Sequence, residues 1–157
     1  MKSIKELYRI GTGPSSSHTM GPRKAAEIFL ARHRHAASFK VTLYGSLAAT
    51  GKGHMTDVAI NDTLTPVAPV EIVWQPKVFL PFHPNAMTFA AFDARQKLLE
   101  NWTVYSIGGG ALAENNEEPT IESKEVYDMR SMTEILNWCE RTGKSYWEYV
   151  KECEDED

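Results

Sequence analysis

Apolar and polar side chains alternate along several short stretches of this chain, and a period of two residues predicts β-strands. Four stretches are predicted as strands: Phe39–Ser46, Val70–Trp74, Met87–Phe92 and Leu98–Ile107. Residues 93–97 join the last two stretches and are few enough for a hairpin. The triple glycine at 108–110 then stops the last strand.

Other stretches carry the helical period of 3.6 residues. Residues 23–34 are rich in helix formers, and one face of this helix is predicted to hold Ala25, Ile28, Phe29 and Arg32. His33 and His35, at its basic end, are interpreted as surface residues. A short helix is predicted over Thr56–Leu64, with Thr56 at its N-cap. The small residues of Gly45–His54 predict a flexible glycine loop.

The last part of the chain begins with a polar, irregular stretch, residues 111–130, which predicts a surface loop or linker. Ser131 with Glu134, and Ser145 with Glu148, have the spacing of a capping box. Each pair therefore predicts the start of a helix. Together these elements predict an α+β fold: a mixed, largely antiparallel sheet with helices packed on one face.

The composition, 42% hydrophobic and 24% charged, is that of an ordinary soluble protein. The formal net charge of −4 arises at the C-terminus, where five of the last six residues are acidic. No stretch could cross a membrane and no signal peptide is evident, which predicts a cytoplasmic protein. No basic stripe indicates nucleic acid. Cys139 and Cys153 are too few for a disulfide framework or a four-ligand metal site.

The strongest candidate for a functional site is Gly11–Pro22, whose glycines and prolines fix an unusual backbone path before a predicted helix. Free backbone N–H groups would form a polar cup there with the hydroxyls of Ser15, Ser16, Ser17 and Thr19. Such a cup at a helix N-terminus favours a carboxylate or phosphate. The alternative is a capped helix start, for which one serine suffices.

Three further polar segments are candidates for the site. Residues 51–54 lack the spacing of a nucleotide phosphate loop, so they are interpreted as a glycine loop that presents Lys52 and His54. The proline after His83 restricts this histidine to an extended conformation, although a lone histidine is more often structural. The glycines of residues 106–110 allow another backbone or a ligand to approach closely.

Four segments, in this order, closely resemble the β domain of bacterial iron–sulfur L-serine dehydratases: Gly13–Pro22, Tyr44–His54, His83–Met87 and Tyr105–Gly110. Four long motifs in register make the resemblance specific. It implies a β domain at residues 1–130 and a helical bridge at 131–157 toward an α domain. It also implies a fold similar to the allosteric substrate-binding domain of D-3-phosphoglycerate dehydrogenases.

Members of this family are lyases that remove water from L-serine, and the resulting aminoacrylate hydrolyses to pyruvate and ammonium. The resemblance implies a [4Fe–4S] cluster held by cysteines of the α domain, where iron makes hydroxide a better leaving group. No cofactor is expected in this chain itself. The implied partners are L-serine, the α domain and a second copy in a homodimer, with no nucleic acid and no membrane.

The resemblance also implies roles for individual residues. His83 is interpreted as the base that takes the α-proton, and His54 as the residue that orients substrate or hydroxyl. Asn85 is expected to contact the carboxylate or the amine of the substrate. The segment Ser15–Thr19, which includes Ser16, Ser17 and His18, is expected to seat the carboxylate, with Lys52 as a weaker candidate nearby.

The chain departs from the family in two respects. Its cysteines lie in no matching motif, and the segment between His54 and His83 is shorter than in many members. Two alternatives stay open: a small-anion or amino-acid sensor without chemistry, and a structural dimerisation module. A sensor needs the cup but neither histidine, and a dimerisation module does not explain the hydroxyls beside His18.

Overall fold

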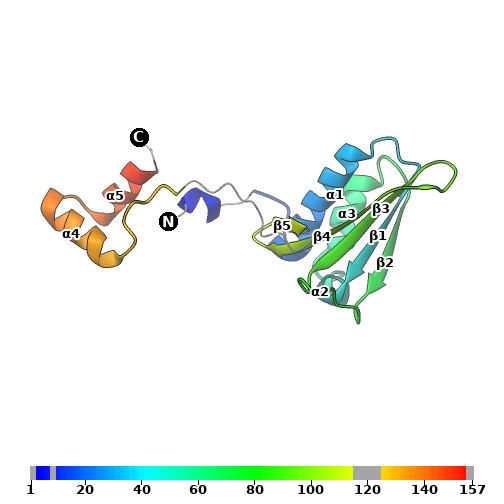
Figure 1. Cartoon of the computed structure of the whole chain (residues 1–157), viewed down its shortest axis with the longest axis horizontal. Helices are drawn as coiled ribbons and strands as arrows, with labels where there is room; N and C mark the ends of the chain where they lie inside the picture. Colours follow the sequence, from blue (N-terminus) through cyan, green and yellow to red (C-terminus); the bar gives the residue numbers. More distant parts are fainter. Residues whose placement is uncertain (1–2, 8–9, 115–124, 155–157) are drawn as a thin grey trace. The chain divides into compact units, whose positions relative to one another are not determined.

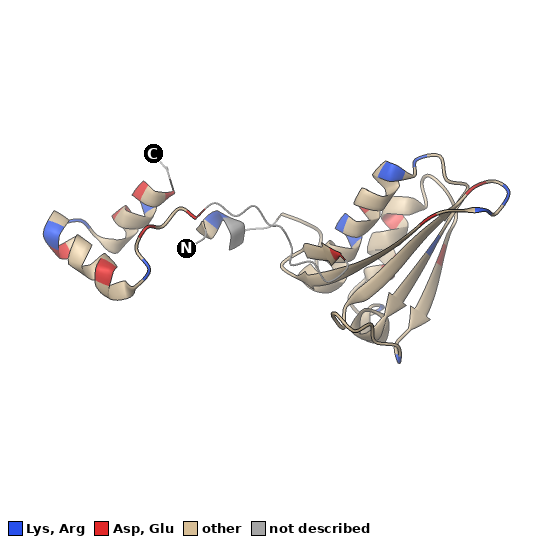
Figure 2. Ribbon diagram, in the orientation of Figure 1, with Lys and Arg blue, Asp and Glu red and all other residues tan. Residues whose placement is uncertain are grey.

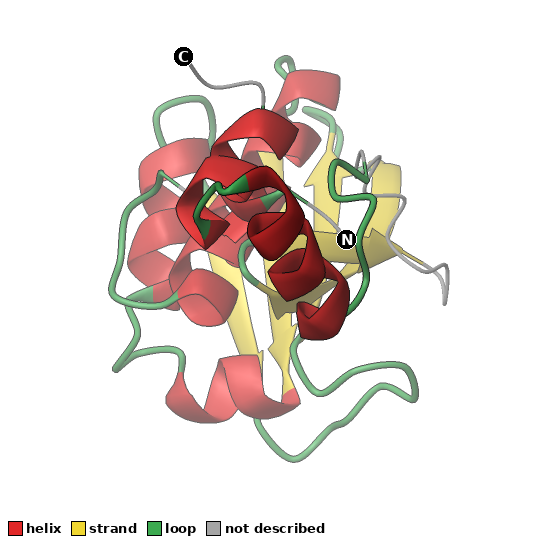
Figure 3. Ribbon diagram, turned by 90° about the vertical axis from the view of Figure 1, so that its left-hand side faces the viewer, coloured by secondary structure: helices red, strands yellow, loops and turns green. Residues whose placement is uncertain are grey.

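The structure is a computed structural model, and it describes residues 3–7, 10–114 and 125–154. Contacts divide the chain into two compact units. The sheet unit comprises residues 10–120, and the helical unit comprises residues 1–9 with 121–157. Figure 3 distinguishes the helices, strands and loops of both units. The N-terminal residues therefore fold with the C-terminal helices.

A five-stranded sheet forms the centre of the sheet unit, in the order β2-β1-β3-β4-β5 (Figure 1). The strands are β1 (Ser38–Tyr44), β2 (Val70–Gln75), β3 (Ala86–Phe92), β4 (Leu98–Gly108) and β5 (Ala111–Glu114). β1 and β2 are parallel, and every other neighbouring pair is antiparallel. The predicted α+β class and largely antiparallel sheet are confirmed, whereas the likeness to the dehydrogenase domain stays a prediction.

Three α-helices accompany the sheet in the described residues: α1 (Gly21–Arg32), α2 (Gly45–Thr50) and α3 (Thr56–Leu64). A π-helical turn (Ser16–Met20) leads into α1. α1 and α3 pack against each other and cover one face of the sheet (Figure 1). The helix predicted over residues 23–34 is confirmed, but its buried face differs in detail. Ile28 is 39% exposed, whereas Ala26 is fully buried beside Phe29.

The alternation along the strands builds the core between sheet and helices. In β1 the residues Phe39, Val41 and Leu43 are buried, while their neighbours are half-buried. Phe29 of α1 stacks on Trp102 of β4 with ring centroids 6.0 Å apart. Burying each large apolar side chain contributes about 1.5–3 kcal/mol, so this layer fixes the strand ends from which the loops emerge.

Two predictions for the sheet unit are wrong. The first half of the predicted glycine loop is helix α2, which buries Leu47 completely against the core. Residues 111–114 of the predicted loop form strand β5 beside β4, and residues 115–124 lie outside the described part of the chain. In both places tertiary contacts, rather than local propensity, make the element.

The helical unit contains α4 (Met132–Thr142), α5 (Tyr146–Cys153) and a 3₁₀ turn (Ile4–Leu7). Both predicted capping boxes are present, at the first turns of α4 and α5. Ile135 and Tyr149 are buried between these helices, as the apolar spacing requires. Met132, in the first turn of α4, is 57% exposed.

Glu154 joins the N-terminal turn to the end of α5. Its carboxylate accepts a hydrogen bond from the backbone N–H of Ile4 at 2.9 Å and another from the hydroxyl of Ser3. The buried Tyr127 donates its hydroxyl to the same carboxylate at 2.6 Å. These contacts explain why residues 3–7 belong to the helical unit.

Acidic and basic side chains are interspersed over the described surface of both units (Figure 2). Within residues 3–7, 10–114 and 125–154, no helix combines the length and the apolar character needed to cross a membrane.

Candidate active site

Hydrogen bonds connect the ends of β1, β3 and β4, where three of the four motifs lie. The N–H of Ser46, at the start of α2, donates to the carbonyl of Pro84 at 3.0 Å. The side-chain amide of Asn85 donates to the carbonyl of Ser106 at 3.3 Å, and the N–H of Ser106 donates to the Asn85 carbonyl at 2.9 Å. These strand ends therefore form one continuous edge.

The fourth motif, the loop before α1, attaches to this edge. His18 Nε2 lies 3.1 Å from the hydroxyl of Ser46. The hydroxyl of Thr19 donates to the carbonyl of His54 at 2.7 Å, and the hydroxyl of Thr56 donates to the carbonyl of His18. The structure thus brings all four motifs of the sequence together. Thr56 is the first residue of α3 rather than its N-cap, which is Met55, so that prediction is wrong.

The hydroxyls of the predicted cup are mostly occupied by the loop itself. Ser15 accepts a hydrogen bond from the N–H of His18 at 3.2 Å, which is the capping role. The buried hydroxyl of Thr19 accepts from the N–H of Ser15 at 3.1 Å. Ser17 lies 2.9 Å from His18 Nδ1. Ser16 is exposed, and its hydroxyl has no hydrogen bond recorded within the described residues.

His54 follows α2 and has a defined tautomer. Its Nδ1 lies 3.0 Å from the carbonyl of Thr50. A carbonyl only accepts, so Nδ1 carries the hydrogen and Nε2 of the neutral ring has a free lone pair. The next residue, Met55, has a left-handed backbone with φ of +57°, which is unfavourable for a side chain of this kind. This local strain lies directly beside the histidine.

His83 has the opposite tautomer. Its Nδ1 accepts a hydrogen bond from the backbone N–H of Asn85 at 3.1 Å. The hydrogen of the neutral ring is therefore on Nε2, which can donate. The two histidines consequently offer complementary atoms, an acceptor on His54 and a donor on His83.

His18 lies between these elements and is half-buried. Its ring centroid is 4.9 Å from that of His54. Burial lowers the pKa of His18, and the nearby His54 lowers it further, whereas a hydrogen bond with the Ser46 backbone raises it. A lowered pKa favours the neutral ring near pH 7.

Lys52 is exposed, and its ammonium lies 5.7 Å from the centre of the Trp74 ring on β2. This contact has the geometry of a cation–π interaction. The structure therefore provides a local partner for Lys52 beside the site.

Gly45 makes the turn from β1 into α2. Its φ is +47°, and an added Cβ would lie 2.6 Å from the carbonyl oxygen of Pro84. Only glycine fits there, and this close approach places Ser46 beside the His83 loop. Sequence reasoning noted the glycine but not Ser46, whose importance depends on contacts with distant parts of the chain.

The two histidines of α1's end behave differently. His35 is exposed, as predicted. His33 is not a surface residue: its side chain is 14% exposed, contacts Glu100, and lies with its ring 4.7 Å from that of Phe29. The prediction failed because α1 ends against the hairpin that carries Glu100.

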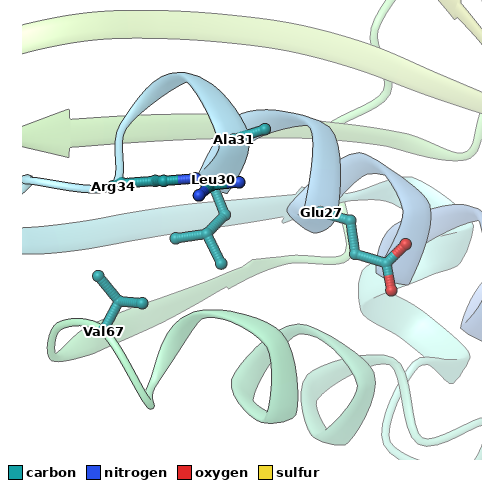
Figure 4. A pocket seen from close by; sticks show the side chains of 5 residues that line it. All are labelled: Glu27, Leu30, Ala31, Arg34 and Val67. Carbon is teal, nitrogen blue, oxygen red and sulfur yellow. The ribbon is translucent and has the colours of Figure 1, made fainter.

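A separate hollow of about 340 Å³ lies between α1 and the turn after α3 (Figure 4). Its lining residues are Glu27, Leu30, Ala31, Arg34 and Val67. None of them belongs to the four motifs, so this hollow is distinct from the histidine site.

The residues present do not fit an iron–sulfur cluster. Within the described chain, no three His, Cys, Asp or Glu side chains gather as metal ligands. Cys139 and Cys153 belong to the core of the helical unit instead.

The family profile of the serine dehydratase beta chain matches residues 3–72 and 61–117. These ranges include all four motifs. This chain belongs to the serine dehydratase beta chain family. The segments that converge in the structure therefore lie within the ranges that match the family.

Individual relatives agree with this family membership. The chain is similar to L-serine dehydratase TdcG of Escherichia coli, with 34% identity over 92% of this chain and 41% of the relative. An L-serine dehydratase of Helicobacter pylori is 31% identical over 95% of this chain and 42% of the relative. The chain thus spans about two fifths of the length of the relatives it matches.

The relatives also contain residues without a counterpart here. The alignment with the E. coli protein runs over 189 positions, more than the 157 residues of this chain. The two ranges of the family match overlap at 61–72, which places a break between the His54 and His83 motifs. Both observations agree with the short segment expected there.

Proposed function

We propose that this chain is the substrate-binding half of an L-serine dehydratase, which converts L-serine to pyruvate and ammonium. The observation that carries the proposal is the convergence of four family motifs around two histidines of opposite tautomer. Elimination of water needs a group that accepts the α-proton and groups that hold the substrate in place.

The hydrogen bonds favour His54 rather than His83 as the base. Nε2 of His54 has a free lone pair, because Nδ1 donates to Thr50. Nε2 of His83 already carries a hydrogen, because Nδ1 accepts from Asn85. We therefore assign proton removal to His54, and a donated hydrogen bond to the substrate's oxygen to His83, the reverse of the roles inferred from the sequence.

The remaining candidates hold the substrate. Asn85 gives its amide hydrogen to Ser106, so its oxygen is placed to accept from the substrate ammonium. The carboxylate is proposed to bind at the start of the helical turn Ser16–Met20 that leads into α1, where Ser16 contributes its hydroxyl and Ser16 and Ser17 contribute backbone N–H groups. Ser15, His18 and Thr19 shape this loop, and Lys52 contributes positive charge at its margin.

Other components lie outside this chain in the proposal. The described residues gather no metal ligands, so the [4Fe–4S] cluster implied by the resemblance belongs to a companion α domain. The length of the relatives leaves room for such a domain. A homodimer and a cytoplasmic location complete the proposal, and light scattering of the assembled enzyme tests the first.

The test uses this chain assembled with its cluster-bearing companion. Pyruvate formation from L-serine establishes the activity, and exchange of the α-proton with deuterium reports the base. His54→Ala should abolish exchange, and His83→Ala should retain exchange while lowering kcat about 10²- to 10⁴-fold. His35→Ala is the matched control, because His35 is exposed and outside the site.

Exchange that survives in His54→Ala but not in His83→Ala would return the base to His83. Binding of L-serine without pyruvate, in the presence of an intact cluster, would favour the sensor alternative.

A further inference from the structure

Three polar side chains form a hydrogen-bonded series at the centre of the site. Ser17 Oγ lies 2.9 Å from His18 Nδ1, and His18 Nε2 lies 3.1 Å from Ser46 Oγ. Neither the sequence motifs nor the family comparison assigns a role to Ser46. Its neighbours nevertheless come from every part of the site.

The position of Ser46 links both catalytic candidates. Its N–H donates to Pro84, directly after His83, at 3.0 Å. Its carbonyl accepts the hydroxyl of Thr50 at 3.0 Å, and the carbonyl of Thr50 fixes the ring of His54. Ser46 is half-buried.

The hydrogen bonds of this series all donate in the same direction along it. A neutral imidazole donates from one nitrogen and accepts at the other, so each hydroxyl contacting His18 takes the complementary role. If Ser17 donates to Nδ1, then Nε2–H donates to Ser46. The Ser46 backbone raises the pKa of His18, and this effect is separate from the contact between His18 Nε2 and the Ser46 hydroxyl.

In this direction the hydrogen of the Ser46 hydroxyl has no acceptor among the recorded contacts of the described residues. We propose that the Ser46 hydroxyl donates a hydrogen bond to the carboxylate of the bound α-amino acid, and that His18 is the positioning residue that orients it. This inference rests on the proposed function and adds a substrate contact to it.

The proposal predicts different effects of Ser46 on KM and on kcat. A hydrogen bond from Ser46 to a carboxylate is present before and during elimination, so its loss weakens binding of ground state and transition state alike. Hydrogen bonds to charged groups are worth about 10- to 100-fold in affinity. Ser46→Ala should therefore raise KM for L-serine by about 10- to 100-fold and change kcat little.

The experiment compares Ser46→Ala and Ser46→Thr in the enzyme assembled with its cluster-bearing companion. Threonine keeps the hydroxyl and should restore most of the affinity. Ser38→Ala is the control, because Ser38 is also a half-buried serine but begins β1 at the end remote from α2. In this chain alone, ¹⁵N NMR of the imidazoles should show His18 protonated at Nε2, with signals that shift in Ser46→Ala.

The outcomes are distinct. Wild-type enzyme that forms pyruvate, with an unchanged KM in Ser46→Ala, overturns the inference and leaves the proposed function standing. Wild-type enzyme that forms no pyruvate overturns both. If Ser46→Ala does not fold, Ser46→Cys keeps a similar volume with a weak donor and should show the same rise in KM. A rise in KM that threonine does not restore also overturns the inference.

Discussion

Replacing Gly21 by alanine tests how the first loop is held against the sheet. Gly21 begins α1 with φ of −58° and ψ of −56°, a backbone that any residue adopts. Alanine is favoured over glycine within a helix by about 1 kcal/mol. Conformation alone would therefore make Gly21→Ala neutral or stabilising.

Packing predicts the opposite result. A Cβ at Gly21 would lie 2.2 Å from Ser106 Oγ and 3.0 Å from Ser106 Cβ. Ser106 is fully buried in β4, and its Cβ moves only if the strand or the helix shifts. Overpacking of this kind costs about 1–3 kcal/mol. After the gain in helix propensity, the net loss in free energy of unfolding should be up to about 2 kcal/mol.

A double-mutant cycle isolates the contact. In a Ser106→Gly background the obstructing atoms are gone, so adding Gly21→Ala should be neutral or stabilising. Urea unfolding followed through the methyl NMR signal of Met87, which is buried in the sheet unit, measures each variant. Gly53→Ala is the control, since its Cβ would meet only a backbone oxygen at 3.5 Å. A Gly21→Ala protein about 1 kcal/mol more stable than the wild type, as helix propensity alone requires, would refute the packing argument.

Further changes should have separate effects. The hydrogen bond from Ser3 lowers the pKa of Glu154, so the stability from this carboxylate is present above the ordinary carboxyl pKa of about 4.3 and lost as the pH falls through the lowered value. The protection factor of the Ile4 amide against hydrogen exchange should fall on acidification, and Glu154→Gln should remove this dependence. His33→Ala should lower the melting temperature of the sheet unit by removing contacts with Phe29 and Glu100, whereas His35→Ala should not. This chain purified alone should lack the visible charge-transfer absorption of an iron–sulfur cluster, and a brown protein would contradict the ligand argument.

Local signals predicted most elements of the fold. The alternation over Phe39–Ser46 became β1 because one face of a strand meets the core. The capping box of Ser131 and Glu134 became the start of α4, because both hydrogen bonds lie within one turn. Such signals depend on residues close in sequence, so the sequence alone suffices to find them.

Elements made by tertiary contacts were missed. α2 has six residues and contains no capping hydrogen bond, yet it forms because Leu47 is buried in the core. β5 has four residues and depends on pairing with β4 after the triple glycine. The hydroxyl of Thr56 has the position expected near a helix start, but the carbonyl of His18 binds it instead. No local pattern could report these partners.

In the candidate site, too, local signals were found from the sequence and tertiary contacts were not. Motif order identified which loops meet, but not which atoms of each residue are free. The sequence predicted that the hydroxyls of Ser15 and Thr19 bind a ligand. In the structure both hydroxyls form hydrogen bonds with backbone groups of this segment, and Thr19 also donates to the carbonyl of His54. A polar loop that packs against another must bond its buried carbonyls and N–H groups, and hydroxyl side chains provide those bonds.

The tautomers of the two histidines also separate the alternatives for function. A site built only to bind an anion gains from N–H donors, because a carboxylate or phosphate accepts hydrogen bonds. His83 meets that need, since its Nε2 carries a hydrogen. His54 does not, since the carbonyl of Thr50 leaves its Nε2 as an acceptor. An acceptor beside an anion site is of little use to a sensor, whereas an elimination needs one group to receive the α-proton. The contact of His54 with the Thr50 carbonyl thus favours catalysis over sensing. No substitution of Thr50 removes its backbone carbonyl, so ¹⁵N NMR of His54 tests the tautomer directly. Nε2 found protonated in the neutral ring would remove this argument for catalysis.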